Sequence, residues 1–193
     1  MGLTVGVLGL QGDFALHRES LKRIGIGSKI VRWPEELQDC GGLILPGGES
    51  TTFVKLLKKT GLFDGIRTFA KDRGVMGTCA GLITLSTKLL NDSMETLGLI
   101  DMEVERNGYG RQVDSFVDKV RISVFQEKPD FEGIFIRAPR IRLVGKGTEA
   151  LGFHGDEIVM AKNDRVLVTT FHPELTKDGR VHRYFVESFL KQV

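Results

Sequence analysis

Val75-Met76-Gly77-Thr78-Cys79-Ala80-Gly81 is the stretch of this 193-residue chain that decides its fold. The apolar residues before Cys79 are typical of a short buried strand, and the Leu- and Ile-rich run after Gly81 is typical of a helix. Cys79 therefore sits on a strand-to-helix turn. Gly77 and Gly81 fit such a turn, because it is too sharp to leave room for side chains two residues from its centre. The pattern predicts an α/β protein with a cysteine exposed at the end of a strand.

Strand and helix patterns alternate outward from this turn. Before it, apolar runs predict strands at residues 3–10, 28–32 and 42–45. Apolar stripes predict a helix between Asp13 and Gly25, a short helix at 35–39, and two more helices around Phe53 and Ile66. After residue 92 shorter runs predict strands at 102–104, 116–124, 133–136, 141–144, 157–161 and 166–171, with a hairpin turn at Asn163-Asp164. A final helix is predicted over 182–193.

This order of elements predicts a single α/β domain spanning residues 1–193. Its central sheet is expected to be mostly parallel, with antiparallel strands and hairpins added in the second half of the chain. No linker, repeat or low-complexity stretch interrupts the pattern.

Composition excludes several classes of protein. Hydrophobic residues make up 41% of the chain and charged residues 27%, as in globular proteins, and no apolar run is long enough to span a membrane. The net charge of +2 without a basic block gives no reason to expect nucleic acid or an anionic membrane as a partner. Two cysteines and no signal-peptide pattern indicate a reducing cytoplasm. We expect small molecules or proteins as partners, and no metal or cofactor.

Cys79 is the candidate nucleophile. A helix that starts directly after it lowers the pKa of a thiol, and so raises the population of the reactive thiolate. The same helix start offers backbone N–H groups, that of Ala80 first, to the oxyanion of a tetrahedral intermediate. The alternative is a buried structural cysteine. That interpretation suits the second cysteine, Cys40, which lies just before a predicted strand without such a turn.

A cysteine that attacks an amide needs a base that can also protonate the leaving nitrogen, and histidine does both near neutral pH. His172 follows a predicted strand and precedes Pro173-Glu174, so Glu174 can fix its tautomer as a third triad member. The alternative is an exposed loop histidine. His17 and His182 are interpreted as packing or capping residues, and His154 as a histidine without a partner.

Three further segments carry candidate binding residues. Pro46-Gly47-Gly48-Glu49-Ser50-Thr51 lies between a predicted strand and a helix, where glycine N–H groups can approach an anion closely; it lacks the lysine and the spacing of a Walker loop. A plain glycine turn capped by Ser50 is the alternative. Arg106 and Arg137 can each clamp a carboxylate, although solvated charges at strand ends would look the same in the sequence.

Several segments together resemble a known family. The Cys79 turn with Phe171-His172-Pro173-Glu174 resembles the class I, or triad, glutamine amidotransferases. More closely, the chain resembles the glutaminase subunits of pyridoxal 5′-phosphate synthase. The segments that carry this closer resemblance are Leu10–Asp13, Leu45–Thr52, Val104–Asn107 with Tyr109–Val113, Ile134–Pro139, Phe171–Thr176 and His182–Phe185.

The resemblance implies a flavodoxin-like, three-layer fold and hydrolysis of glutamine to glutamate and ammonia. It implies that Cys79 is the nucleophile, His172 the acid and base, and Glu174 the residue that orients His172. The matching glutamine-binding positions are Gly47, Gly48, Glu49, Arg106, Ile136 and Arg137. Gly48 and Ala80 would form the oxyanion hole. Gln11 matches a position near the interface with a separate (β/α)₈-barrel synthase, which uses the ammonia to make pyridoxal 5′-phosphate and activates the glutaminase by docking.

Two other functions stay open at this point. One is a thiol hydrolase that acts alone, such as a γ-glutamyl peptidase on the same fold. The other is a regulatory subunit in which the triad is vestigial.

Overall fold

The computed structural model describes residues 3–109 and 115–190, and within them nine strands form one sheet. These strands are β1 (Thr4–Leu8), β2 (Gly27–Val31), β3 (Gly42–Leu45), β4 (Gly74–Thr78), β7 (Ser115–Ile122), β8 (Asp130–Ile136), β10 (Glu149–His154), β11 (Glu157–Lys162) and β12 (Val166–Thr169). Their spatial order is β2-β1-β3-β4-β12-β11-β10-β7-β8. Adjacent strands from β2 to β12 pair in parallel, and those from β12 to β8 pair antiparallel.

Four of the five parallel strands, β1, β3, β4 and β12, are buried along almost their whole length, whereas the edge strand β2 is only partly buried. In β3 and β4 every residue is buried, as expected for strands covered by helices on both faces. β12 pairs in parallel with β4 although the two strands are distant in the sequence, with Val166 opposite Val75 and Thr169 opposite Thr78. The carboxyl ends of β3, β4 and β12 therefore meet at one edge of the sheet.

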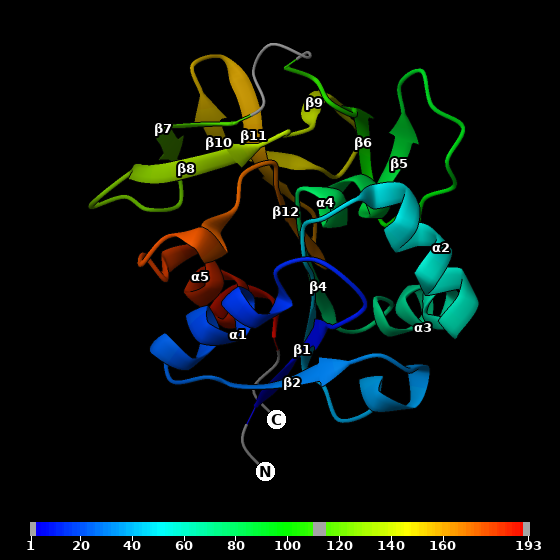
Figure 1. Cartoon of the computed structure of the whole chain (residues 1–193). Helices are drawn as coiled ribbons and strands as arrows, with labels where there is room; N and C mark the ends of the chain where they lie inside the picture. Colours follow the sequence, from blue (N-terminus) through cyan, green and yellow to red (C-terminus); the bar gives the residue numbers. More distant parts are fainter. Residues whose placement is uncertain (1–2, 110–114, 191–193) are drawn as a thin grey trace.

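A helical layer covers each face of the parallel strands (Figure 1). On one face lie α1 (Phe14–Arg23) and α5 (Arg180–Phe189); on the other lie α2 (Ser50–Thr60), α3 (Leu62–Phe69) and α4 (Ala80–Leu85). Each layer has its own apolar core, one containing Leu21 and Phe185 and the other Phe53 and Ile66. Two short 3₁₀ turns, η1 (Pro34–Leu37) and η2 (Pro173–Leu175), complete the helical elements of the described residues. The three-layer α/β expectation is confirmed.

A smaller sheet of β5 (Ser86–Leu89), β6 (Ile100–Glu105) and β9 (Arg140–Val144) lies beside α4. β5 and β6 pair in parallel, and β6 and β9 pair antiparallel. It is seen at the upper right of Figure 1. The strands from the second half of the chain are therefore divided between the two sheets.

The sequence patterns missed two strands, β5 and β10. β5 follows α4 without a turn residue, and its two central residues are exposed, so it carries no strand periodicity. β10 contains Gly152, around which its register with β11 shifts twice, and this irregularity breaks the alternation that marks a strand. The other predicted strands are present, with their ends displaced by at most three residues.

Cap and turn residues end several elements where the sequence predicted. α1 starts after Asp13 and stops before Gly25, whose φ of +78° ends the helix, although the Asp13 side chain makes no capping bond. Asn163 caps the turn between β11 and β12, since its side-chain oxygen accepts from the N–H groups of Arg165 and Val166. α5 ends at Phe189, while residues 191–193 of the predicted last helix lie outside the described residues. No helix in the described ranges has the length and apolar character needed to cross a bilayer.

Candidate functional site

Three loops that leave the carboxyl ends of β3, β4 and β12 bring the candidate residues together. The loop after β3 carries Gly47 to Glu49, the turn after β4 carries Cys79, and the loop after β12 carries His172 and Glu174. Parallel α/β sheets bind their ligands at this edge. The parallel pairing of β3, β4 and β12 places all three loops at the same edge of the sheet.

The Cys79 turn is held in a strained backbone conformation. Cys79 has φ +50° and ψ −105°, a region that non-glycine residues rarely occupy and that clusters at functional sites. A β-carbon added to Gly81 would lie 2.1 Å from the Leu45 carbonyl oxygen, so the helix start must be a glycine to lie this close to β3. The Cys79 N–H donates to the Thr169 carbonyl at 2.9 Å, which ties the turn to β12.

His172 and Glu174 form a buried pair on η2. Nδ1 of His172 lies 2.7 Å from Oε1 of Glu174, and the two residues are 4% and 2% exposed. Gly47 packs against both His172 and Cys79: a β-carbon there would lie 2.5 Å from His172 Cε1 and 3.4 Å from Cys79 Cβ. The structure thus brings the three predicted triad residues and Gly47 into one cluster.

In this cluster the neighbouring groups shift the pKa values of His172 and Glu174 more than burial does. Burial lowers the pKa of His172, but the neighbouring Cys79 sulfur and Glu174 carboxylate outweigh it and raise that pKa to about 10. Burial likewise raises the pKa of Glu174, while the contacts of its carboxylate with His17 Nε2 and with the charged His172 hold that pKa at about 2. A protonated His172 beside an ionised Glu174 is therefore the favoured state at neutral pH.

The β7–β8 hairpin closes the site from the antiparallel half of the sheet. The His172 N–H donates to the Ile134 carbonyl at 2.9 Å, and Cys79 Sγ lies 3.9 Å from the Ile136 carbonyl oxygen as a weak donor. Ile136 is thus adjacent to the sulfur, as its predicted binding position requires. Arg137 follows with φ +42° and an exposed side chain, at the rim of the site.

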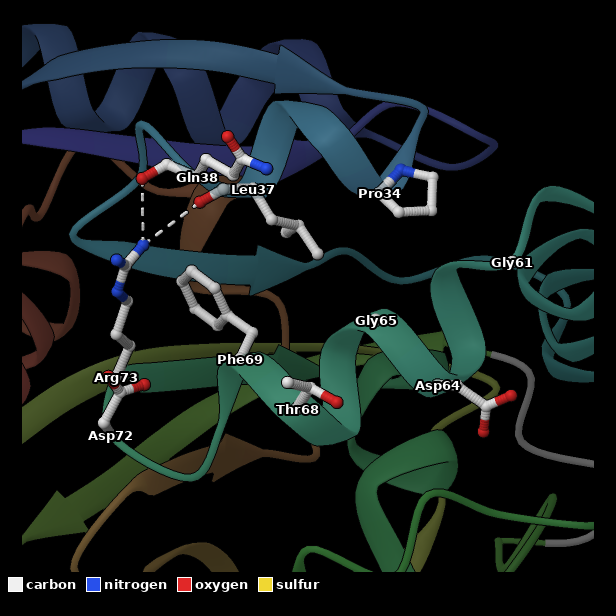
Figure 2. A pocket seen from close by; sticks show the side chains of 10 residues that line it. All are labelled: Pro34, Leu37, Gln38, Gly61, Asp64, Gly65, Thr68, Phe69, Asp72 and Arg73. Atoms are coloured by element: carbon white, nitrogen blue, oxygen red, sulfur yellow. Dashed lines mark hydrogen bonds between the residues drawn. The ribbon is translucent and has the colours of Figure 1, made fainter.

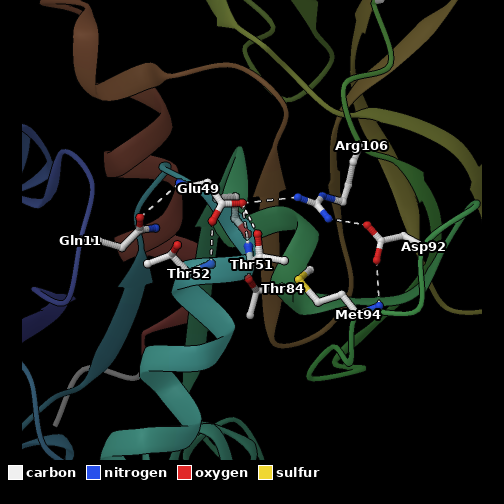
Figure 3. Close-up of polar contacts among 9 residues, drawn as sticks. Gln11, Glu49, Thr51, Thr52, Thr84, Asp92, Met94 and Arg106 are labelled. Carbon is white, nitrogen blue, oxygen red and sulfur yellow. Dashed lines mark hydrogen bonds and ion pairs between the residues drawn. The ribbon is translucent and has the colours of Figure 1, made fainter.

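Glu49 organises the loop after β3 (Figure 3). Its carboxylate accepts from the N–H groups of Thr51 at 3.0 Å and Thr52 at 2.7 Å, and so caps α2. Hydrogen bonds from Thr51 and Thr52 lower the pKa of Glu49 to about 2 despite some desolvation. The capping role that the sequence offered to Ser50 as an alternative belongs to Glu49.

Gln11 lies against the same loop. Its Oε1 accepts from the Glu49 N–H at 3.1 Å, and a β-carbon on Gly48 would lie 2.5 Å from its Nε2. Nε2 is buried and makes no hydrogen bond among the described residues. Gln11 therefore touches the loop that holds Gly48, one of the two residues predicted to form the oxyanion hole.

Arg106 is held by two carboxylates. Nη1 forms an ion pair with Asp92, and Nη2 lies 3.5 Å from Glu49 Oε1 (Figure 3). Asp92 is fixed in turn by the Met94 N–H at 2.8 Å. Asp92 was not among the predicted residues, because its only mark in the sequence is a short side chain that can accept a hydrogen bond from the backbone two residues on.

Three histidines lie outside the triad. The prediction that His154 has no partner is wrong: Nε2 lies 2.9 Å from Asp118 Oδ2, across the pairing of β7 and β10. The two residues are 36 positions apart, and β10 was not predicted, so the sequence offered no way to pair them. His17 and His182 are buried as expected for packing residues, and they also contact each other.

A pocket of about 500 Å³ lies between η1 and α3, away from this site (Figure 2). Arg73, which directly precedes β4, donates there to the carbonyls of Leu37, Gln38 and Cys40. The pocket is thus at the amino ends of β3 and β4, at the opposite edge of the sheet from Cys79. Cys40 is buried beside it, and burial raises the pKa of its thiol, which fits a structural cysteine.

Comparison with known proteins first gives the class. A crystal structure of a glutamine amidotransferase, 45% identical, matches 95% of this chain and 97% of its own length with a TM-score of 0.89. A putative GMP synthase protein from Thermoplasma acidophilum, 18% identical over 97% of this chain and 94% of its own, shares the fold with a TM-score of 0.69. The fold is that of a glutamine amidotransferase.

The family follows from sequence comparison. Residues 7–191 match the SNO glutamine amidotransferase family, and this chain belongs to that family. Two curated relatives are named pyridoxal 5′-phosphate synthase subunit PdxT. The one from Thermosipho africanus is 44% identical over 98% of this chain and all of its own length, and the one from Fervidobacterium nodosum is 47% identical over 96% of each. The family resemblance inferred from the motifs is confirmed.

Proposed function

We propose that this chain hydrolyses L-glutamine to L-glutamate and ammonia, and that the ammonia passes to a separate synthase subunit that makes pyridoxal 5′-phosphate. The observation that carries the proposal is the buried contact of His172 with Glu174 beside Cys79, at the strand edge where α/β proteins bind ligands. The names of the PdxT relatives supply the synthase and its product. The whole chain, residues 1–193, acts as one glutaminase domain.

The reaction uses the three residues in sequence. The Cys79 thiolate attacks the side-chain amide carbon of glutamine, and a C–S bond forms while the carbonyl oxygen becomes an oxyanion. His172 donates its proton to the amide nitrogen, the C–N bond breaks and ammonia leaves. His172 then takes a proton from water, which attacks the thioester carbon; the C–S bond breaks, glutamate leaves and the Cys79 thiolate is restored beside the protonated His172. Glu174 holds His172 in the orientation and tautomer that both steps need.

The remaining predicted residues bind and polarise the substrate. The N–H groups of Gly48 and Ala80 receive the oxyanion. Glutamine itself lies among Gly47, Gly48, Glu49, Arg106, Ile136 and Arg137. Arg106 takes the α-carboxylate of glutamine in this proposal, and its contacts with Asp92 and Glu49 keep the guanidinium in place before the substrate binds.

Gln11 links the oxyanion loop to the partner. Because Gln11 accepts from the Glu49 N–H and packs against Gly48, a partner that displaces Gln11 changes the backbone that receives the oxyanion. We propose that a (β/α)₈-barrel synthase docks near Gln11 and raises glutaminase activity in this way. Both cysteines are free thiols, which suits the reducing cytoplasm as the place of action.

Measuring ammonia release from L-glutamine, first by this chain alone and then after adding the barrel synthase, tests the proposal. We expect weak hydrolysis alone, a large increase with the partner, and no hydrolysis by the Cys79→Ala variant in either case. Full activity without the partner would favour a stand-alone thiol hydrolase such as a γ-glutamyl peptidase. No hydrolysis under any condition, with Cys79 inert to a glutamine-like electrophile, would favour a vestigial triad.

A further inference from the structure

Two histidines that the proposed reaction does not use lie next to Glu174. His17 is on α1, His182 is on α5, and both are completely buried. His182 Nε2 lies 3.0 Å from His17 Nδ1. His17 Nε2 lies 3.5 Å from Glu174 Oε2 and 3.2 Å from Thr78 Oγ1. The rings therefore continue the line of polar groups that begins at His172 and Glu174.

The second oxygen of Glu174 is the reason this contact matters. Oε1 faces His172, but Oε2 is buried and makes no conventional hydrogen bond among the described residues. A buried carboxylate oxygen without a donor is costly, and that cost favours a rotation of the carboxylate away from His172. The group facing Oε2 is His17 Nε2. A proton on that nitrogen stabilises the charged carboxylate in the orientation that His172 requires.

The proton positions follow from which nitrogens have partners. Burial lowers the pKa of His17, and it lowers that of His182 to about 3, so each ring is neutral and carries one proton. Among the described residues, His182 Nδ1 is buried without a partner, and a proton there would be an unpaired donor. The proton of His182 is therefore on Nε2 and is donated to His17 Nδ1.

This assignment leaves the proton of His17 on Nε2, where it faces Thr78 Oγ1 and Glu174 Oε2. The opposite arrangement would direct a lone pair of His17 at a carboxylate. Metal binding does not account for the cluster, because no group of three His, Cys, Asp or Glu side chains in the described part of the chain is placed to hold a metal ion.

We propose that His17 and His182 are positioning residues for the triad: His182 fixes the tautomer of His17, and His17 donates to Glu174, which in turn orients His172. This inference rests on the proposed glutaminase function. It adds two residues from α1 and α5 to a site otherwise built from strand ends.

Steady-state glutamine hydrolysis, measured in the assembly with the barrel synthase, tests the inference. We expect His17→Leu to lower kcat by about 10- to 100-fold with little change in KM, because orientation is lost and substrate contacts are kept. His17→Gln, whose amide can place a donor near the position of Nε2, should recover much of the loss. His182→Leu should lower kcat less, and adding it to His17→Leu should change nothing further, because it acts through His17.

His154→Gln is the matched control, since its ring pairs with Asp118 outside the triad and its loss should leave kcat unchanged. Circular dichroism and melting temperature identify variants that fail to fold. If the wild-type assembly is active and a folded His17→Leu variant is equally active, the inference is overturned while the glutaminase function stands. An inactive wild-type assembly would instead overturn the proposed function itself.

Nitrogen-detected NMR of the wild-type chain tests the same inference without any variant. We expect both His17 and His182 to be neutral at pH 7 and protonated on Nε2. A charged ring, or a proton on Nδ1 of either residue, would contradict the assigned hydrogen-bond chain.

Discussion

At the scale of single residues, the charge of His172 depends on its neighbours Cys79 and Glu174. Desolvation alone would make His172 a weaker base than a free imidazole. Its pKa of about 10 therefore depends on the two groups beside it, the Cys79 sulfur and the Glu174 carboxylate. Since the pKa is raised in the folded protein, the stability that this pairing contributes is fully present below pH 6.5 and is lost as the pH rises toward 10.

Removing the sulfur should lower the pKa of His172. In Cys79→Ala, Glu174 still raises the pKa of His172, but the contribution of the sulfur is lost while burial still lowers that pKa. We therefore expect the pKa of His172 to fall clearly below its wild-type value. An NMR titration of the His172 ring measures this shift. Cys40→Ala is the control, because that cysteine lies at the other end of the strands and should leave the titration unchanged. An unaltered His172 titration in Cys79→Ala would mean that the sulfur and the ring do not interact.

Short elements of structure hold the site residues at the scale of helices and turns. α2 begins at the loop that carries Gly47 to Glu49, so the cap that starts this helix also fixes the loop. α4 starts directly after Cys79, and Gly81 lets it lie against the Leu45 carbonyl of β3, where a side chain would not fit. The residues that start α2 and α4 thus also hold the loops of the candidate site in place.

Glu49→Ala should destabilise the protein by roughly 1 kcal/mol at pH 7, the usual cost of a lost helix cap. The folded-state pKa of Glu49, about 2, lies below its ordinary value of 4.5, so the contribution is present above pH 4.5 and is lost as the pH falls toward 2. Urea unfolding of wild type and variant should therefore show a difference that shrinks on acidification. Glu95→Ala, which removes an exposed ion pair, is the control expected to change little. A difference that grows in acid would contradict Glu49 as an ionised cap.

Gly81→Ala should cost about 1–3 kcal/mol of stability, because the added methyl group meets the backbone carbonyl of Leu45, which cannot move aside as a side chain could. The displaced α4 should also slow alkylation of Cys79 by a glutamine-like electrophile. Gly27→Ala is the matched control, since the nearest atom to its added carbon is 3.5 Å away, an ordinary contact. If Gly81→Ala were as stable and reactive as Gly27→Ala, the close packing of α4 on β3 would not be a requirement of the site.

The whole molecule shows which features could be predicted from sequence. Its parallel half was predictable because each buried strand is a continuous apolar run and each helix repeats its apolar stripe. The Cys79 turn and its His172–Glu174 partners were predictable because local sequence carries them: glycines for the turn, and a two-residue spacing for the pair.

Contacts between distant segments could not be predicted in the same way. The pairing of His154 with Asp118 depends on β10 meeting β7, and β10 is hidden by its irregular register. The ion pair of Asp92 with Arg106 likewise depends on how two loops meet. His17 and His182 are 165 positions apart in the sequence, and only the fold makes them neighbours. Tertiary packing alone determines these partners.

The central claim is that Cys79 releases ammonia from glutamine for use by another subunit. Its most direct test is pyridoxal 5′-phosphate formation by the complete assembly, with either L-glutamine or an ammonium salt as the nitrogen source. We predict that Cys79→Ala abolishes synthesis from glutamine and leaves synthesis from ammonium at the wild-type rate. Glutamine-dependent synthesis by Cys79→Ala at the wild-type rate would contradict the claim.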